Sequence, residues 1–110
     1  MWGVSELNIQ TMDKDLIEGV GRKILENVLE ALDYWAWNCS PSTPLETYSS
    51  YNSIDLYDAA CDFCGWSRAH ITEEDLKFLQ EMPDEIYDKL NQEYHERLEG
   101  VIEKLSEEDE

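Results

Sequence analysis

Basic residues are scarce in this sequence of 110 residues, and their scarcity restricts the partners that it can bind. There are 8 Lys and Arg against 26 Asp and Glu, which gives a formal net charge of −18 at pH 7. A field of this sign repels phosphate groups, so direct binding to DNA, RNA or an anionic membrane is excluded. The same composition is also typical of a surface that only maintains solubility and of adaptation to high salt.

Long apolar runs are absent, and cysteines are few. No stretch reaches the length of a membrane-spanning helix or of the apolar core of a signal peptide, and the first residues carry no basic charge. We therefore expect a cytoplasmic protein. The three cysteines form an odd number, which argues against a disulfide framework. With 42% hydrophobic residues, the chain is expected to form a single domain, residues 1–110, with one core.

Motifs of catalysis and nucleotide binding are also missing. The sequence has no G-x-G-x-x-G, Walker A, G-x-S-x-G or H-E-x-x-H motif. His70 and His95 are its only histidines, and neither has the neighbours of a catalytic triad or of a di-iron Glu-x-x-His pair. We therefore predict that the protein is not an enzyme and has no cofactor, and that both histidines are solvated surface residues.

Apolar residues recur at helical spacing along most of the chain, which predicts an all-α fold. The pattern indicates a small bundle of about four helices, near 13–38, 54–68, 73–81 and 83–105. The apolar positions of the first helix are Leu16, Ile17, Val20, Ile24, Val28, Leu32 and Trp35. Those of the last helix are Ile86, Leu90, Tyr94, Leu98, Val101, Ile102 and Leu105. The remaining segments are expected to be an arm at 1–12, a proline-containing loop at 39–53 and a flexible acidic tail at 106–110.

Several residues predict where these helices begin and where they meet. Asp13 and Thr72 are suitable N-cap residues, and Pro83 suits the first position of the last helix. Gly19 and Gly21 weaken the first helix, by up to about 1 kcal/mol each. We interpret the two glycines as the point where a neighbouring helix crosses closely.

Cys61-Asp62-Phe63-Cys64 is the one spacing in the chain that is typical of a metal site, and it allows three interpretations. The two thiols could pack as small apolar groups on one stripe of the predicted helix 54–68. They could instead form a zinc site together with Cys39 and His70. A redox pair is the third interpretation, but the β-α-β context of such pairs is missing. We predict packing.

Aromatic residues gather near the end of the first predicted helix. Tyr34, Trp35 and Trp37 lie within that helix, and Tyr48 and Tyr51 lie in the segment that follows. One interpretation is a corner of the core, where aromatic rings supply apolar burial. The other is a contact patch containing Tyr34 and Trp37, because aromatic residues are enriched at the centres of protein interfaces.

Acidic residues of the last predicted helix recur at steps of three, four and eight, which places them on one face, away from the apolar positions. This acidic face consists of Glu85, Asp88, Glu96, Glu99, Glu103 and Glu107. Its length is roughly 33 Å at a rise of about 1.5 Å per residue, comparable to about ten phosphates of one DNA strand. A helix of this kind could occupy a cleft that is built for a phosphate backbone.

The combination of length, acidity, helical pattern and a long acidic C-terminal helix resembles the phage-encoded DNA-mimic inhibitors of host defence. These include Ocr-like anti-restriction proteins and some anti-CRISPR proteins. The resemblance implies a protein in the host cytoplasm that binds the basic nucleic-acid-binding surface of a defence enzyme and blocks DNA. It is a resemblance of architecture and charge over most of the chain, so it assigns no functional residues beyond the exposed acids.

Two other functions are compatible with the sequence. An acidic immunity protein or antitoxin would neutralise one basic nuclease toxin, whereas a DNA mimic would compete with nucleic acid for several unrelated enzymes. A zinc-stabilised adaptor is the third hypothesis. In the first two cases the partner is a basic DNA-binding protein or nuclease, and the sequence leaves homodimer formation open.

Overall fold

The computed structural model describes residues 13–39 and 43–108 and has an all-α fold, as predicted. Over these residues the chain forms five helices and no strand: α1 (Lys14–Asn38), α2 (Pro44–Asn52), α3 (Leu56–Phe63), α4 (Glu73–Glu81) and α5 (Asp84–Glu108). The arm expected at 1–12 lies outside the described residues.

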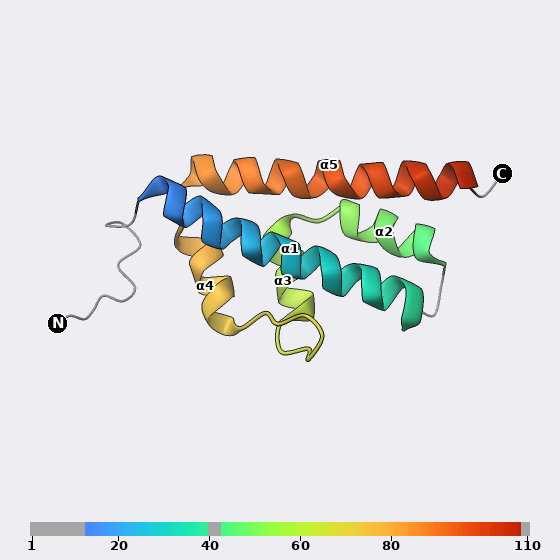
Figure 1. Ribbon diagram of the computed structural model, residues 1–110, viewed down its shortest axis with the longest axis horizontal. Helices are drawn as coiled ribbons and strands as arrows, with labels where there is room; N and C mark the ends of the chain where they lie inside the picture. Colours follow the sequence, from blue (N-terminus) through green and yellow to red (C-terminus); the bar gives the residue numbers. More distant parts are fainter. Residues whose placement is uncertain (1–12, 40–42, 109–110) are drawn as a thin grey trace.

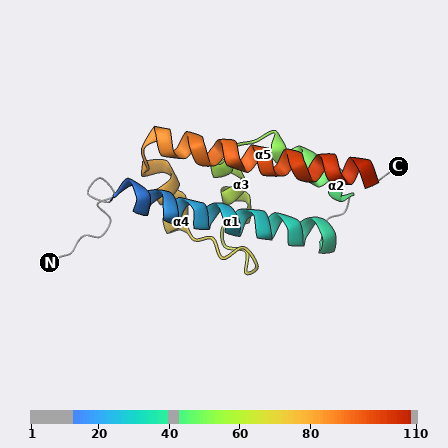
Figure 2. The same cartoon turned by 45° about the horizontal axis from the view of Figure 1, so that its top comes forward.

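The two longest helices, α1 and α5, run side by side in the same direction (Figures 1 and 2). Each has 25 residues. Helix α2 runs back antiparallel to both and packs against α5 (Figure 1). The shorter helices α3 and α4 then return the chain to the start of α1, so that α5 can lie parallel to it. The crossover through α3 and α4 is what a parallel pair of helices requires.

The core lies between α1, α5 and the shorter helices, and it uses the apolar positions that the sequence indicates. The buried positions of α5 are Ile86, Leu90, Tyr94 and Leu98. Those of α1 include Ile17, Ile24, Val28 and Leu32. Val101, Ile102 and Leu105 pack against the edge of this core. Leu16 was expected on the buried face but is 54% exposed, because it lies beside the apolar stripe rather than on it.

The predicted helix starts are confirmed in part. At Thr72 the hydroxyl accepts a hydrogen bond from the Asp75 amide, and the Asp75 carboxylate accepts one from the Thr72 amide, which forms a complete capping box. Asp13 occupies the N-cap position of α1 without a capping hydrogen bond from its side chain. Helix α5 begins at Asp84, and the carbonyl of Pro83 accepts hydrogen bonds from Ile86 and Tyr87.

The loop predicted at 39–53 is wrong, because its second part forms α2. The Thr43 hydroxyl accepts a hydrogen bond from the Glu46 amide, and Pro44 lies in the first turn, where its missing N–H costs nothing. Tyr48 is 2% exposed and donates a hydrogen bond to the carboxylate of Asp33 on α1. Pro44 therefore lies at the start of a helix, where a loop was expected.

The ends of two other helices also differ from the prediction. Helix α3 was expected to continue to residue 68 but ends at Phe63, and Gly65 follows with a φ of 84°. Such a φ favours glycine and is incompatible with a continuing helix. The acidic tail expected from Ser106 is helical as far as Glu108, since α5 extends through it.

Of the two glycines in α1, Gly21 alone lies at a close helix crossing, and this difference can be tested. A Cβ at Gly21 would lie 2.5 Å from Leu90 Cδ1 and 3.0 Å from Met82 Cε, whereas at Gly19 nothing lies within 4 Å. We expect Gly19→Ala to raise the free energy of unfolding by up to about 1 kcal/mol through its better helix propensity. Gly21→Ala should lower it by about 1 kcal/mol or more, because the buried Leu90 must move.

Urea unfolding followed by circular dichroism measures this difference. Gly100→Ala is a second control, because Gly100 also has open space around its Cα. Equal effects of the Gly19 and Gly21 substitutions would show that the α1–α5 crossing tolerates a methyl group.

Candidate protein-binding surface on the C-terminal helix

Side chains on one side of α5 fix its orientation by binding the start of α3 and the end of α2. The Tyr57 amide donates to the Tyr87 hydroxyl at 3.1 Å, and the Leu56 amide donates to Asn91 Oδ1 at 2.8 Å. One turn further, the Tyr94 hydroxyl donates to the Tyr51 carbonyl at 3.0 Å. These hydrogen bonds, together with the buried apolar seam, determine which face of α5 points to solvent.

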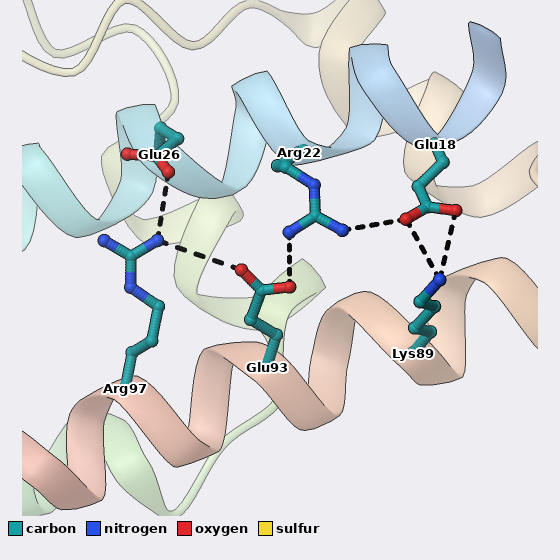
Figure 3. Close-up of polar contacts among 6 residues, drawn as sticks. All are labelled: Glu18, Arg22, Glu26, Lys89, Glu93 and Arg97. Carbon is teal, nitrogen blue, oxygen red and sulfur yellow. Dashed lines mark hydrogen bonds and ion pairs between the residues drawn. The ribbon is translucent and has the colours of Figure 1, made fainter. Parts of the chain in front are cut away.

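A ladder of ion pairs joins α1 to another side of α5. Each of its four pairs joins residues 71 positions apart: Lys14–Glu85, Glu18–Lys89, Arg22–Glu93 and Glu26–Arg97. Figure 3 shows the last three pairs in a row between the two ribbons. The constant separation follows from the parallel arrangement of the helices. The charges also alternate along each helix at four-residue steps, so each member has oppositely charged neighbours on both helices.

Hydrogen bonds within the ladder favour the charged forms of Glu18 and Arg22. Those from Arg22 and then Lys89 hold the pKa of the Glu18 carboxyl below its usual value. In return, hydrogen bonds to Glu18 and Glu93 raise the pKa of the Arg22 guanidinium. The ladder uses half of the 8 basic residues of the chain and an equal number of acids. It is therefore neutral, and the net charge of −18 lies entirely on the rest of the chain.

The predicted acidic face of α5 lies on the solvent side, next to the ladder. All of its members are exposed: Glu85, Asp88, Glu96, Glu99, Glu103 and Glu107. Glu85 differs from the others because its carboxylate pairs with Lys14 at 2.9 Å. Glu96 accepts a hydrogen bond from Gln92 at 3.2 Å, a neutral partner that leaves its charge uncompensated. Among the described residues no ion pair involves the acids from Asp88 onward on this face.

A shallow groove of about 440 Å³ borders the acidic face on the side of α2. Its lining consists of Ser49, Asn52, Glu99, Ile102, Glu103 and Ser106. Two carboxylates of the acidic face thus lie beside hydroxyl and amide groups, and no basic side chain lines this groove. His95, expected to be a solvated surface residue, is instead half-buried nearby, with its Nδ1 3.3 Å from Asn52 Oδ1.

The aromatic residues proposed as part of the same site lie elsewhere and have different environments. Trp37 is 58% exposed. Tyr34 is half-buried, packs against Trp66 at 6.0 Å between ring centroids, and has the Arg68 guanidinium 4.6 Å from its ring centre. Both lie at the C-terminal end of α1, which is apart from α5 in both views (Figures 1 and 2). The candidate residues therefore form two separate surfaces.

The cysteines do not form the site that their spacing suggested. Cys39, Cys61 and His70 are exposed, and Cys64 is half-buried against the core. Over residues 13–39 and 43–108, no group of three or more His, Cys, Asp or Glu side chains is placed to hold a metal ion. The predicted packing of both thiols is wrong for Cys61, because the buried stripe of α3 consists of Leu56, Ala59, Ala60 and Phe63.

Two further findings concern the chain as a whole. Among the helices of the described part, none has an apolar stretch that is long enough to span a bilayer. Comparison with protein-family models, curated protein sequences and solved structures gives no match.

Proposed function

We propose that this protein binds the basic nucleic-acid-binding surface of a host defence enzyme, of the restriction or CRISPR type, and blocks its access to DNA. The observation that carries the proposal is the acidic face of α5. From Asp88 to Glu107 its carboxylates are exposed on one side of a single helix, and no cation of the described chain pairs with them. Surfaces of this kind attract the Lys and Arg side chains that line DNA-binding clefts.

The way α5 is held supports this function. Three sets of contacts hold the helix. They are the ion-pair ladder, the buried seam, and the hydrogen bonds to the end of α2 and the start of α3. The carboxylates therefore project from a supported helix, and little backbone entropy is lost when a partner binds. The ladder also pairs half of the basic residues with acids, and of these acids Glu85 alone belongs to the acidic face.

The charge density of the face sets how strong the interaction can be. From Glu85 to Glu107 the acidic face spans roughly 33 Å and presents six carboxylates, where one DNA strand of that length carries about ten phosphates. Glu85 is already paired with Lys14, so five charges remain for a partner. Binding should therefore come from many weak contacts that release counterions, with no single dominant residue.

Inhibition assays with purified restriction endonucleases and CRISPR effector nucleases test the proposal. We expect DNA cleavage by at least one of them to be inhibited, and short duplex DNA to compete with the protein for the enzyme. Affinity should fall by roughly 100- to 1,000-fold between 50 and 200 mM salt, since about five Lys or Arg side chains of the enzyme are neutralised. The control is enzyme that is loaded with DNA before the protein is added, which should resist inhibition.

Two results would contradict this function. Inhibition that DNA does not relieve would place the binding site outside the nucleic-acid cleft. Tight binding to a single nuclease toxin, without inhibition of any enzyme in the panel, would instead support an immunity protein or antitoxin.

A further inference from the structure

A second recessed surface lies at the end of α3, and it is aromatic. The groove has a volume of about 480 Å³ and is lined by Trp35, Tyr51, Phe63 and Trp66, with Asp62, Cys64 and Gly65 completing the lining. Three segments far apart in the sequence supply it: the end of α1, the end of α2, and the end of α3 with the turn that follows. Its residues include neither Trp37 nor any member of the acidic face.

The rings of this groove support one another and are only partly covered. Tyr51 stacks on Phe63 with 5.5 Å between ring centroids and 21° between ring planes, and Trp66 lies 5.5 Å from Phe63 on a tilted plane. Trp35 meets both Tyr51 and Phe63 edge-on, at 6.0 and 6.5 Å. Phe63 is buried, whereas the other three rings are half-buried. The groove is therefore formed in advance, with aromatic surface still open to solvent.

Asp62 gives the groove a negative charge. Its side chain is exposed, and no ion pair involves it among the described residues. Its carboxylate acts on Tyr51: burial, then the Asp62 charge and a hydrogen bond to Asp62 raise the pKa of the Tyr51 hydroxyl to about 12. The negative charges of Asp55 and, to a smaller extent, Asp62 also raise the pKa of the Asp58 carboxyl by repulsion. This edge of α3 therefore attracts cations, as do the faces of the aromatic rings.

The same cluster of rings already holds a guanidinium at its edge. Arg68 places its guanidinium carbon 4.6 Å from the centre of the Tyr34 ring, and Tyr34 in turn contacts Trp66. An arginine side chain suits such a surface because its planar head stacks on aromatic rings and forms bidentate hydrogen bonds with a carboxylate. Trp35, Tyr51 and Trp66 supply the rings of the groove, and Asp62 supplies the carboxylate.

We propose that the aromatic groove binds the guanidinium of an arginine side chain presented by the basic partner protein. The guanidinium stacks on the open faces of the rings, and Asp62 accepts its hydrogen bonds. The identity of the partner rests on the proposed function, but the recognition of arginine rests on the groove alone. Arginine binding in the groove adds specificity that the long acidic face lacks. Only a partner that has an arginine at the right distance from its basic cleft can occupy the groove and the acidic face at the same time.

Nuclear magnetic resonance with a minimal ligand tests the groove without any partner. The probe is the blocked tripeptide acetyl-Gly-Arg-Gly-amide, and its matched control carries citrulline, which has the same shape without the charge. We expect the arginine peptide to shift the indole N–H signals of Trp35 and Trp66 in a saturable way, and to leave that of Trp37 unchanged. The citrulline peptide should bind at least about fivefold more weakly.

Two substitutions that remove the same charge distinguish binding in the groove from attraction by the overall negative charge of the protein. Asp62→Asn should weaken binding of the arginine peptide by about fivefold, whereas Asp88→Asn, on the acidic face, should change it less than about twofold. Equal weakening by both substitutions, equal binding of both peptides, or shifts that do not saturate would overturn the proposal. These results are independent of the inhibition assays, so failure of the groove and failure of the acidic face can be told apart.

Discussion

A variant in which Glu96, Glu99 and Glu103 are all changed to Gln is expected to lose inhibition of the target enzyme. These residues lie in the central part of the acidic face, they are exposed, and no ion pair of the described chain involves them. Three contacts of up to about 1 kcal/mol each amount to a loss of affinity of roughly 100-fold. A single change should cost little, because the remaining carboxylates maintain the field.

The matched control for this variant removes the same charge from other surfaces. Glu30 on α1 and Glu74 and Glu81 on α4 are also exposed, and changing them to Gln should alter affinity by less than about threefold. Circular dichroism establishes that both variants are folded, and calorimetry at low salt measures binding. Equal losses would mean that only total charge matters. Full activity of the first variant would move the site elsewhere, and the exposed Trp37 end of α1 is then the next surface to test.

The sequence predicts the two long helices well because their apolar residues follow the helical period over many turns. Helix α1 begins and ends within one residue of the prediction. The start of α5 is also within one residue, while its end is three residues further along the chain. Both helices contribute uninterrupted stripes to the core, and such stripes are the strongest local signal in a sequence.

Helix α2 could not be predicted from periodicity, because its buried residues are few. Only Thr47 and Tyr48 are buried in it, and three of its nine residues are serine or asparagine. A start signal was nevertheless present, with Thr43 before Pro44 and Glu46 in the first turn. In α3 the sequence pattern predicts both thiols on the buried stripe, but that stripe consists of Leu56, Ala59, Ala60 and Phe63, and Cys61 is exposed. Which side of so short a helix is buried depends on its tertiary contacts.

For the candidate surface, the sequence predicts the members of the acidic face but not their surroundings. Spacing within one helix is enough to place Asp88 to Glu107 on one side. The ladder and the aromatic groove depend on segments that meet only in the folded chain. In hindsight, the sequence contains a signal for a parallel pair of helices. Charges alternate at four-residue steps from Lys14 to Glu26, and charges of the opposite sign alternate in the same way from Glu85 to Arg97.

Raising the pH above 10 is expected to destabilise the protein strongly, because buried tyrosines resist ionisation. Tyr94 and Tyr48 are 0% and 2% exposed. Burial raises the pKa of both hydroxyls well above the usual value of 10, and the hydrogen bond to Asp33 adds to this for Tyr48. In the unfolded chain both tyrosines ionise near pH 10. Above that pH the folded state binds more protons than the unfolded state, so the free energy of unfolding falls as pH rises.

At pH 10 half of the unfolded tyrosines are ionised, so the slope for each buried tyrosine rises from half of its limiting value of about 1.4 kcal/mol per pH unit. The expected loss between pH 10 and 11 is about 1 kcal/mol for each tyrosine, or about 2 kcal/mol for the two together. That is a large part of the stability of a small domain, which is typically about 5–15 kcal/mol. Burial also raises the pKa of the half-buried Tyr51 and Tyr87 to about 12, which adds to the loss. Urea unfolding at pH 9, 10 and 11 measures the slope.

The double variant Tyr48→Phe, Tyr94→Phe is the control that assigns the slope to these two hydroxyls. At pH 7 it should be less stable than the parent by about 1 kcal/mol for each lost hydrogen bond, to Asp33 and to the Tyr51 carbonyl. Between pH 10 and 11 its stability should fall by about 2 kcal/mol less than that of the parent, so that the two curves converge. Parallel curves would show that the loss at high pH comes from charge repulsion over the whole acidic surface, and not from ionisation of tyrosines in the core.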